Sequence, residues 1–333
     1  MRSETRGNGA EIAPLADNTI YLGDARELLL RIEAESVALS FWSPPYFVGK
    51  SYEKDLSYEE WCALLRAVIE RHARILKPGA FLAINIADIL CFADPSVPRI
   101  QAESVSGHRL PVSREDVLRV FAQHPNYNRY QVAKVLGVSE QTVDRRLKNN
   151  NIRGGKYAPQ TRTKLVGGLL EDTAYTAGLY LYDRRIWVKD PAWENSRWHT
   201  NSYRAVDEFE YVYIFWKPGI TTVDRSRLSR EEWTDWGSRA VWSIPSVRAN
   251  NDHEAKFPLE LARRVIRLLT NRGDLVLDPF VGSGTTAVAS IQEERRYMGF
   301  DILSKYVTLA TRNCRLAHAY ETPSPLSLSA RTG

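Results

Sequence analysis

Four consecutive residues, Ser43-Pro44-Pro45-Tyr46, carry the groups in this sequence that are best suited to hold a planar amine. The Ser43 hydroxyl and the Pro44 carbonyl can each accept a hydrogen bond from an NH2 group, and the Tyr46 ring can stack on the plane that bears it. Proline suits this role because its φ is fixed while its carbonyl stays free. The alternative is a simple Pro-Pro turn that ends a strand, and the tetrapeptide alone leaves both interpretations open.

A second motif, residues 278–286 (DPFVGSGTT), follows an apolar run and precedes a helical pattern. Its glycines allow a tight strand-to-helix turn and a close approach of the backbone to a ligand. Asp301 ends the next predicted strand, 23 positions after Asp278, where a carboxylate could bind the two hydroxyls of a ribose. The third glycine of the dinucleotide fingerprint is missing, so the pattern favours an adenosine-containing cofactor that need not be NAD. The alternative is a packing turn with a helix-capping carboxylate.

Together the two motifs resemble the DNA amino-methyltransferases, which transfer a methyl group from S-adenosylmethionine to an exocyclic amine of a base. The target-amine motif comes first, which is the permuted order of the family's beta group, and residues 253–258 (HEAKFP) are similar to its cofactor-side motif. Glutamine-modifying methyltransferases are rejected because they carry Asn-Pro-Pro-Tyr after the glycine turn. The resemblance covers about 17–90, 183–217 and 250–318. It implies an α/β fold, the seven-stranded class I (Rossmann-like) methyltransferase sheet.

The resemblance also implies a role for each motif residue. Ser43, Pro44, Pro45 and Tyr46 would form the catalytic loop, with the tyrosine stacked on a base extruded from the duplex. Asp301 would bind the ribose of S-adenosylmethionine. The full set of cofactor-binding residues would be Asp24, His253, Phe257, Asp278, Phe280, Gly282, Gly284, Thr285 and Asp301. Asp24 could instead cap a helix, and His253 could be a surface or capping histidine.

The serine bears on the substrate. In the family, Ser-Pro-Pro-Tyr is associated mostly with cytosine N4 and Asp-Pro-Pro-Tyr mostly with adenine N6. We therefore expect a site-specific DNA cytosine-N4 methyltransferase that belongs to a restriction-modification system. An adenine-N6 methyltransferase of the same fold is the first alternative. A DNA-binding regulator whose methyltransferase domain only senses the cofactor is the second.

A basic helical segment interrupts the α/β pattern, with helices expected at about 114–123, 129–136 and 140–149. Residues 130–148 resemble a helix-turn-helix, in which Gly137 would make the turn. The residues that would face DNA are Gln141, Thr142, Arg145, Arg146 and Lys148. The alternative is an ordinary helical hairpin with a solvated basic face.

The elements that must position these motifs alternate between apolar strands and amphipathic helices, which indicates a parallel sheet. Strands are expected at 19–22, 37–42, 80–86, 185–188, 208–216 (antiparallel), 275–277 and 297–300, and helices at about 25–32, 58–76, 258–270 and 285–293. The predicted organisation is a disordered tail (1–15), the target-amine half of the methyltransferase domain (16–93), an insertion (94–182) with its DNA-binding helices at about 113–152, the last strands (183–217), a candidate target-recognition loop (218–250), the cofactor half (251–320) and a disordered tail (321–333).

Composition is that of a globular protein with a mild preference for anionic partners: 333 residues, a net charge of +5 and a pI of about 9.0. The cysteines at 62, 91 and 314 are widely spaced and the histidines form no cluster, so no metal site is expected. No apolar run approaches 18 residues and no signal peptide is recognised. We expect a bacterial or archaeal cytoplasmic protein, monomeric or homodimeric. Its expected partners are double-stranded DNA and a cognate restriction endonuclease. Membrane association is not expected.

Overall fold

The computed structural model describes residues 14–47, 56–97, 112–148, 161–191, 205–247 and 256–321. The chain divides into a large unit (1–89, 165–190 and 208–333) and a small unit (90–164 and 191–207). Residues 165–182 were expected in the insertion, but they belong to the large unit. The reason is α6 (Gly167–Thr176), a helix that packs against α2 (Tyr58–Ile75).

The large unit is built on one eight-stranded sheet with the strand order β1-β10-β9-β2-β3-β7-β6-β8. Its strands are β1 (Thr19–Leu22), β2 (Val37–Trp42), β3 (Leu76–Ile86), β6 (Tyr180–Val188), β7 (Phe209–Trp216), β8 (Val241–Ser243), β9 (Leu275–Asp278) and β10 (Arg296–Asp301). The first five strands in that order are parallel, β7 is antiparallel to both of its neighbours, and β8 is parallel to β6. Seven strands were expected; the eighth, β8, has only three residues and therefore gives no period-2 signal.

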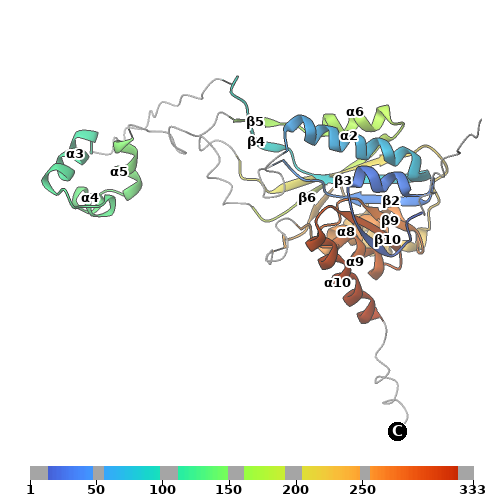
Figure 1. Cartoon of the computed structure of the whole chain (residues 1–333). Helices are drawn as coiled ribbons and strands as arrows, with labels where there is room; N and C mark the ends of the chain where they lie inside the picture. Colours follow the sequence, from blue (N-terminus) through green and yellow to red (C-terminus); the bar gives the residue numbers. More distant parts are fainter. Residues whose placement is uncertain are drawn as a thin grey trace, which may run out of the picture. The chain divides into compact units, whose positions relative to one another are not determined.

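Helices cover both faces of this sheet. Figure 1 shows α2 and α6 on one face, and α8, α9 and α10 on the other. The remaining bounds are α1 (Ala25–Leu28), α7 (Arg230–Glu232), α8 (Leu259–Leu269), α9 (Thr285–Gln292) and α10 (Ser304–Glu321), with short 3-10 turns at Leu29–Arg31 and Arg225–Arg227 and a π turn at Trp233–Gly237. Because helices lie on both faces, all six residues of β2 are buried, as the apolar run predicted.

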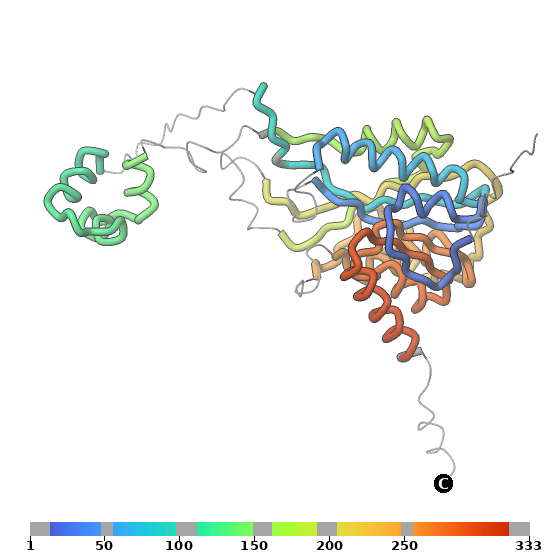
Figure 2. Tube along the Cα trace, viewed as in Figure 1, coloured from blue at the N-terminus to red at the C-terminus, as the bar shows by residue number. Residues whose placement is uncertain are grey.

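The first strand lies beside the last one. β1 pairs in parallel with β10, with Leu22 opposite Asp301, and the backbone N–H of Gly23 donates to the Asp301 carbonyl at 3.0 Å. In Figure 2 the blue start of the chain therefore runs along its red end. This pairing brings the residues that follow β1 to the same edge as those that follow β10.

A buried histidine braces the centre of the sheet. His72 in α2 is fully buried, and its Nδ1–H donates to the Val68 carbonyl at 2.6 Å while Nε2 lies 2.8 Å from the Ser40 hydroxyl of β2. Burial lowers the pKa of His72 to about 4. The ring is therefore neutral at physiological pH and ties α2 to the strand that ends in the proline motif.

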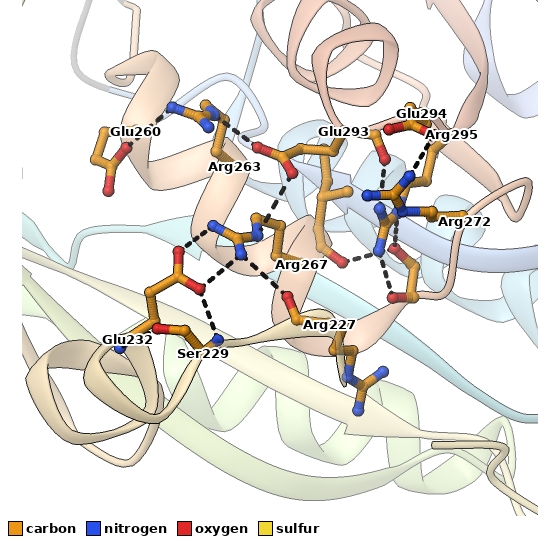
Figure 3. Close-up of polar contacts among 12 residues, drawn as sticks. Arg227, Ser229, Glu232, Glu260, Arg263, Arg267, Arg272, Glu293, Glu294 and Arg295 are labelled. Atoms are coloured by element: carbon orange, nitrogen blue, oxygen red, sulfur yellow. Dashed lines mark hydrogen bonds and ion pairs between the residues drawn. The ribbon is translucent and has the colours of Figure 1, made fainter. Parts of the chain in front are cut away.

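Residues 217–232 lie at the amino ends of the parallel strands. The backbone N–H of Lys217 donates to the Ala80 carbonyl, and Trp236 is buried in the core against α8. Arg267 of α8 lies between Glu232 and Glu293 in Figure 3 and makes ion pairs with both carboxylates. Residues 218–232, the first part of the expected target-recognition loop (218–250), are therefore fixed at the edge opposite the proline motif. The chain then returns toward the other edge, because the Ile186 N–H near the end of β6 donates to the Ala240 carbonyl. A target-recognition role for the rest of 218–250 stays a prediction.

The small unit contains three helices, α3 (Arg114–Gln123), α4 (Arg129–Leu136) and α5 (Glu140–Leu147), close to the predicted ranges. Their core holds Val117, Val132 and Val143. Gly137 ends α4 with a φ of 64°, the left-handed conformation that glycine adopts without strain. A two-stranded sheet, β4 (Ile89–Ala93) with β5 (Thr161–Lys164), was not expected.

Candidate active site

The two motifs lie side by side at the carboxyl edge of the sheet. β2 and β9 are adjacent and parallel, with Ser40 opposite Leu277, so the proline loop (residues 43–47) and the glycine turn (residues 278–284) leave from neighbouring strands. Between these two segments the ring centroids of Trp42 and Phe280 are 5.3 Å apart, and the Thr286 hydroxyl lies 3.4 Å from the Phe41 carbonyl. Ligands bind at such an edge in open α/β sheets.

The proline loop presents two hydrogen-bond acceptors, and the hydroxyl hydrogen of Ser43 points into the protein. The Ser43 hydroxyl lies 2.7 Å from the Tyr46 Oη and 3.0 Å from the Asn85 carbonyl, and either can accept its hydrogen. The Pro45 carbonyl accepts from the Trp61 indole at 2.6 Å, which fixes the loop. Among the described residues nothing donates to the Pro44 carbonyl. The lone pairs of Ser43 and the Pro44 carbonyl thus remain for an amine.

The end of this loop is held in a strained conformation. Phe47 has a φ of 55°, a left-handed value that costs a bulky residue on the order of 1–3 kcal/mol. Its ring packs 5.7 Å from that of Tyr58 and 6.0 Å from that of Trp61. These aromatic contacts offset the strain and pin the loop to the start of α2.

A polar network behind the loop was not predicted. Asn85 of β3 is fully buried, and its amide donates to the Tyr46 Oη at 2.8 Å and to Glu210 at 2.7 Å. The Tyr46 hydroxyl donates to the same Glu210 oxygen at 2.6 Å. The other oxygen pairs with Lys189 at 2.7 Å. The signal that could have found Asn85 is an amide inside the apolar run of β3, since buried amides need partners.

The glycine turn holds Asp301 by backbone groups. The N–H of Gly282 donates to one carboxylate oxygen at 3.1 Å, and the N–H of Leu303 donates to the other at 2.8 Å. Gly284 precedes α9 with a φ of 88°, and a Cβ there would lie only 3.0 Å from Ala310 of α10, so a side chain at this position would be strained and crowded. Burial raises the pKa of Asp301. The half-exposed carboxylate keeps lone pairs free, which fits the ribose hydroxyls of an adenosine cofactor.

Asp278 braces this turn from inside. One of its oxygens accepts from the Thr286 hydroxyl at 2.6 Å, and the other accepts from the Phe280 N–H at 3.0 Å. Burial raises the pKa of Asp278 to about 7, and the nearby Asp301 charge acts in the same direction. The carboxyl therefore orients the backbone that a cofactor would approach.

The model of the DNA methylase (N6/N4 methyltransferase) family matches residues 37–312, which include both motifs and the strands that carry them. The chain belongs to this family. It is 60% identical over 299 residues to the Type II methyltransferase M.BglI of Bacillus subtilis, a match that covers 90% of this chain and 86% of that protein.

Two solved structures share the fold of this methylase. TTHA0409 of Thermus thermophilus, crystallised with S-adenosyl-L-methionine, superposes with a TM-score of 0.58 and 24% identity over 89% of this chain and 93% of its own. The cytosine-N4-specific PvuII DNA methyltransferase gives 0.57 and 18% over 95% and 92% of the two chains. The class I methyltransferase fold expected from the sequence is thus confirmed.

Three of the other cofactor-site predictions can be located in the methylase, and one of them, Thr285, is the first residue of α9. Asp24 caps α1 by accepting from the Arg26 N–H at 2.7 Å, and its ion pair with the Arg26 guanidinium holds the pKa of Asp24 below its usual value. This is the helix-cap role that was left open. Phe257 packs on Phe41 with ring centroids 5.1 Å apart, while His253 lies outside the described residues.

The predicted DNA-facing residues of α5 and its C-cap, Lys148, separate into three groups. Gln141 is exposed and Arg145 is half-buried. Lys148 pairs with Asp144, and Arg146 donates to the Val112 carbonyl at 2.8 Å. The prediction for Thr142 is wrong, because the side chain is buried and its hydroxyl lies 3.0 Å from that of Ser139 at the helix cap.

Within the described ranges, no group of three or more His, Cys, Asp or Glu side chains is placed to hold a metal ion. None of the helices in those ranges is long and apolar enough to cross a membrane.

Proposed function

We propose that this methylase transfers a methyl group from S-adenosylmethionine to the N4 amine of a cytosine in duplex DNA, at one recognition sequence. The observation that carries the proposal is the pair of free acceptors, the Ser43 hydroxyl and the Pro44 carbonyl, beside the glycine turn. A neutral serine at this position, where relatives selective for adenine mostly have aspartate, supports cytosine.

The acceptors would act on the geometry of the amine. An exocyclic NH2 is a poor nucleophile because its lone pair is delocalised into the ring. When Ser43 and the Pro44 carbonyl accept both N–H bonds, the nitrogen becomes pyramidal and its lone pair points away from the base plane. The contribution of the chain is therefore orientation and a preorganised polar site.

The opposite side of the site would hold the cofactor, whose sulfonium supplies an electrophilic methyl group. Asp301 would accept hydrogen bonds from the ribose hydroxyls, and Phe280, Gly282 and Gly284 would line the methionine part. The contact between Trp42 and Phe280 supports this arrangement, because it joins the wall of the cofactor side to the strand that ends in the proline loop.

Two further features concern the DNA. A base paired inside a duplex is out of reach of this edge, so the target would have to be extruded, with Tyr46 stacked on it. The likeness to a Type II methyltransferase supports a role in a restriction-modification system, in the cytoplasm and with a cognate endonuclease. The helical insertion would add DNA contacts through Gln141, Arg145 and Lys148.

The test is transfer of a tritiated methyl group to genomic DNA, followed by hydrolysis and chromatography of the bases. The label is expected to elute with N4-methylcytosine. Label in N6-methyladenine would refute the choice of base. No transfer to any DNA would favour a regulator that only senses the cofactor.

A further inference from the structure

We propose that Glu210 completes the target-amine site by accepting, through Ser43 and the Tyr46 hydroxyl, the proton that the methylated amine must lose. This inference rests on the proposed function and extends it to a residue outside both motifs. The four motif residues of the loop contain no carboxylate, and Glu210 reaches it from 164 positions away in the sequence.

The position of Glu210 follows from the strand directions. β7 is antiparallel to β3, so the first residues of β7 lie at the edge where the parallel strands end. Glu210 is only 6% exposed, and a buried carboxylate is costly unless its oxygens have partners. Lys189 pairs with one oxygen, and the Asn85 amide and the Tyr46 hydroxyl donate to the other. Among the described residues, the titratable groups that bond to Glu210 are Tyr46 and Lys189.

The hydrogen bonds of Asn85 set the direction of the proton route. Because the Asn85 amide donates to the Tyr46 Oη, that oxygen is an acceptor on this side, and its own hydrogen points to Glu210. The remaining lone pair of the Tyr46 Oη faces the Ser43 hydroxyl at 2.7 Å. The route therefore runs from Ser43 to Tyr46 to Glu210, over two O–H···O contacts of 2.7 and 2.6 Å, both in the normal range.

Protons and electrons balance along this route. As the bond between the amine nitrogen and the methyl carbon forms, the nitrogen gains positive charge and holds one excess proton, which begins to move in the same transition state. The electron pair of the breaking carbon–sulfur bond stays on sulfur. That proton moves to the Ser43 oxygen, the Ser43 proton to the Tyr46 oxygen, and the Tyr46 proton to Glu210. The products are the neutral methylated base and a protonated Glu210, which returns its proton to solvent before the next turnover.

Two single variants and their double test this route. Tyr46→Phe keeps the ring but removes the relay hydroxyl, and Glu210→Gln keeps the side-chain volume but removes the acceptor charge. Each is expected to slow single-turnover methylation by about 100-fold, the lower end for positioned proton transfer. The double variant should be no slower than either single one. The acid limb of the pH–rate profile, which reports protonation of the acceptor, should disappear in Glu210→Gln.

Three further readouts separate the relay from a loss of structure. The affinity for S-adenosylmethionine by calorimetry, the affinity for DNA, and the fluorescence of 2-aminopurine at the target position should stay within about twofold of wild type in both variants. Glu208→Gln is the matched control, because Glu208 is an exposed carboxylate two residues before Glu210. Its rate should equal that of the wild type.

Several results would overturn the inference. If Tyr46→Phe retains a wild-type rate, the hydroxyl carries no proton. If Glu210→Gln is slow but keeps the acid limb, the carboxylate only positions the loop. If Glu210→Gln does not fold, Tyr46→Phe still decides. A labelled N6-methyladenine product would refute only the choice of base, since the same rates can be measured on it, whereas a wild type that methylates no DNA would refute both proposals.

Discussion

At the residue scale, the site consists of motif residues that the sequence reveals and of partners that it does not. Ser43, Tyr46 and Asp301 stand in recognisable local patterns, from which roles in the site could be proposed. Asn85 and Glu210 lie inside or next to apolar strands, and the contact that matters joins positions 46 and 210. Such a contact depends on which strands become neighbours, and local spacing carries no information about that.

Asp278 gives a prediction for stability against pH. In the unfolded chain its carboxyl titrates near its ordinary pKa of 3.8, and in the folded protein burial raises the pKa to about 7. Between these values the folded state holds a proton that the unfolded state has lost, so this contribution to stability is present at low pH and is lost as the pH rises through 7. From pH 5 to pH 8.5 the contribution of Asp278 to the free energy of unfolding should fall by about 2–3 kcal/mol.

The measurement is the free energy of unfolding in urea for wild type and Asp278→Asn at both pH values. The advantage of the wild type over the variant should shrink by that amount. Taking the difference cancels the opposite slope from His72, whose lowered pKa makes the protein lose stability as the pH falls from about 6.5 to about 4. If the free energies of unfolding of the two proteins change equally between the two pH values, Asp278 does not titrate as described.

At the element scale, strands with strong patterns were predicted well and short or atypical elements were not. The apolar run of β2 and the capping box and amphipathic period of α2 gave bounds within a residue of those observed. In contrast, α6 begins with two glycines, which are poor helix formers, and is fixed by its packing on α2. Tertiary contacts decide such elements, so their sequences are weak guides.

The helix α5 is expected to contact DNA through two of its side chains. Gln141 and Arg145 lie four positions apart, one helical turn, with Gln141 exposed, whereas Thr142 and Val143 face the core of the small unit. Replacing both Gln141 and Arg145 by alanine is expected to weaken DNA binding about tenfold at low salt and to reduce its salt dependence.

Fluorescence anisotropy with labelled duplex DNA provides the measurement for α5. Arg114→Ala is the control, since it removes one exposed positive charge from the first turn of α3 in the same unit. Equal affinities for the double variant, the control and the wild type would mean that α5 is a solvated helix without a role in binding.

At the scale of the whole molecule, the order of the motifs along the chain and their order in space are different things. β1 is the first strand of the sheet in sequence and β10 is the last, yet they are neighbours in space. The large unit is interrupted after β3 and after β6, and both strands end at the edge of the proline loop. The sequence predicted the first interruption from its change in composition. It could not reveal that the connection after β7 lies at the opposite edge, because only the pairing of β7 sets that.

The account depends on one extruded base lying between the proline loop and the glycine turn. The most direct test is a crystal structure of the protein with its cognate DNA duplex and S-adenosylhomocysteine, read as the distance from the exocyclic nitrogen of the target base to the Pro44 carbonyl oxygen. We expect an extruded cytosine whose N4 lies within about 3 Å of that oxygen and of the Ser43 hydroxyl. A target base that stays stacked in the duplex, or that is bound away from Pro44, would contradict the account.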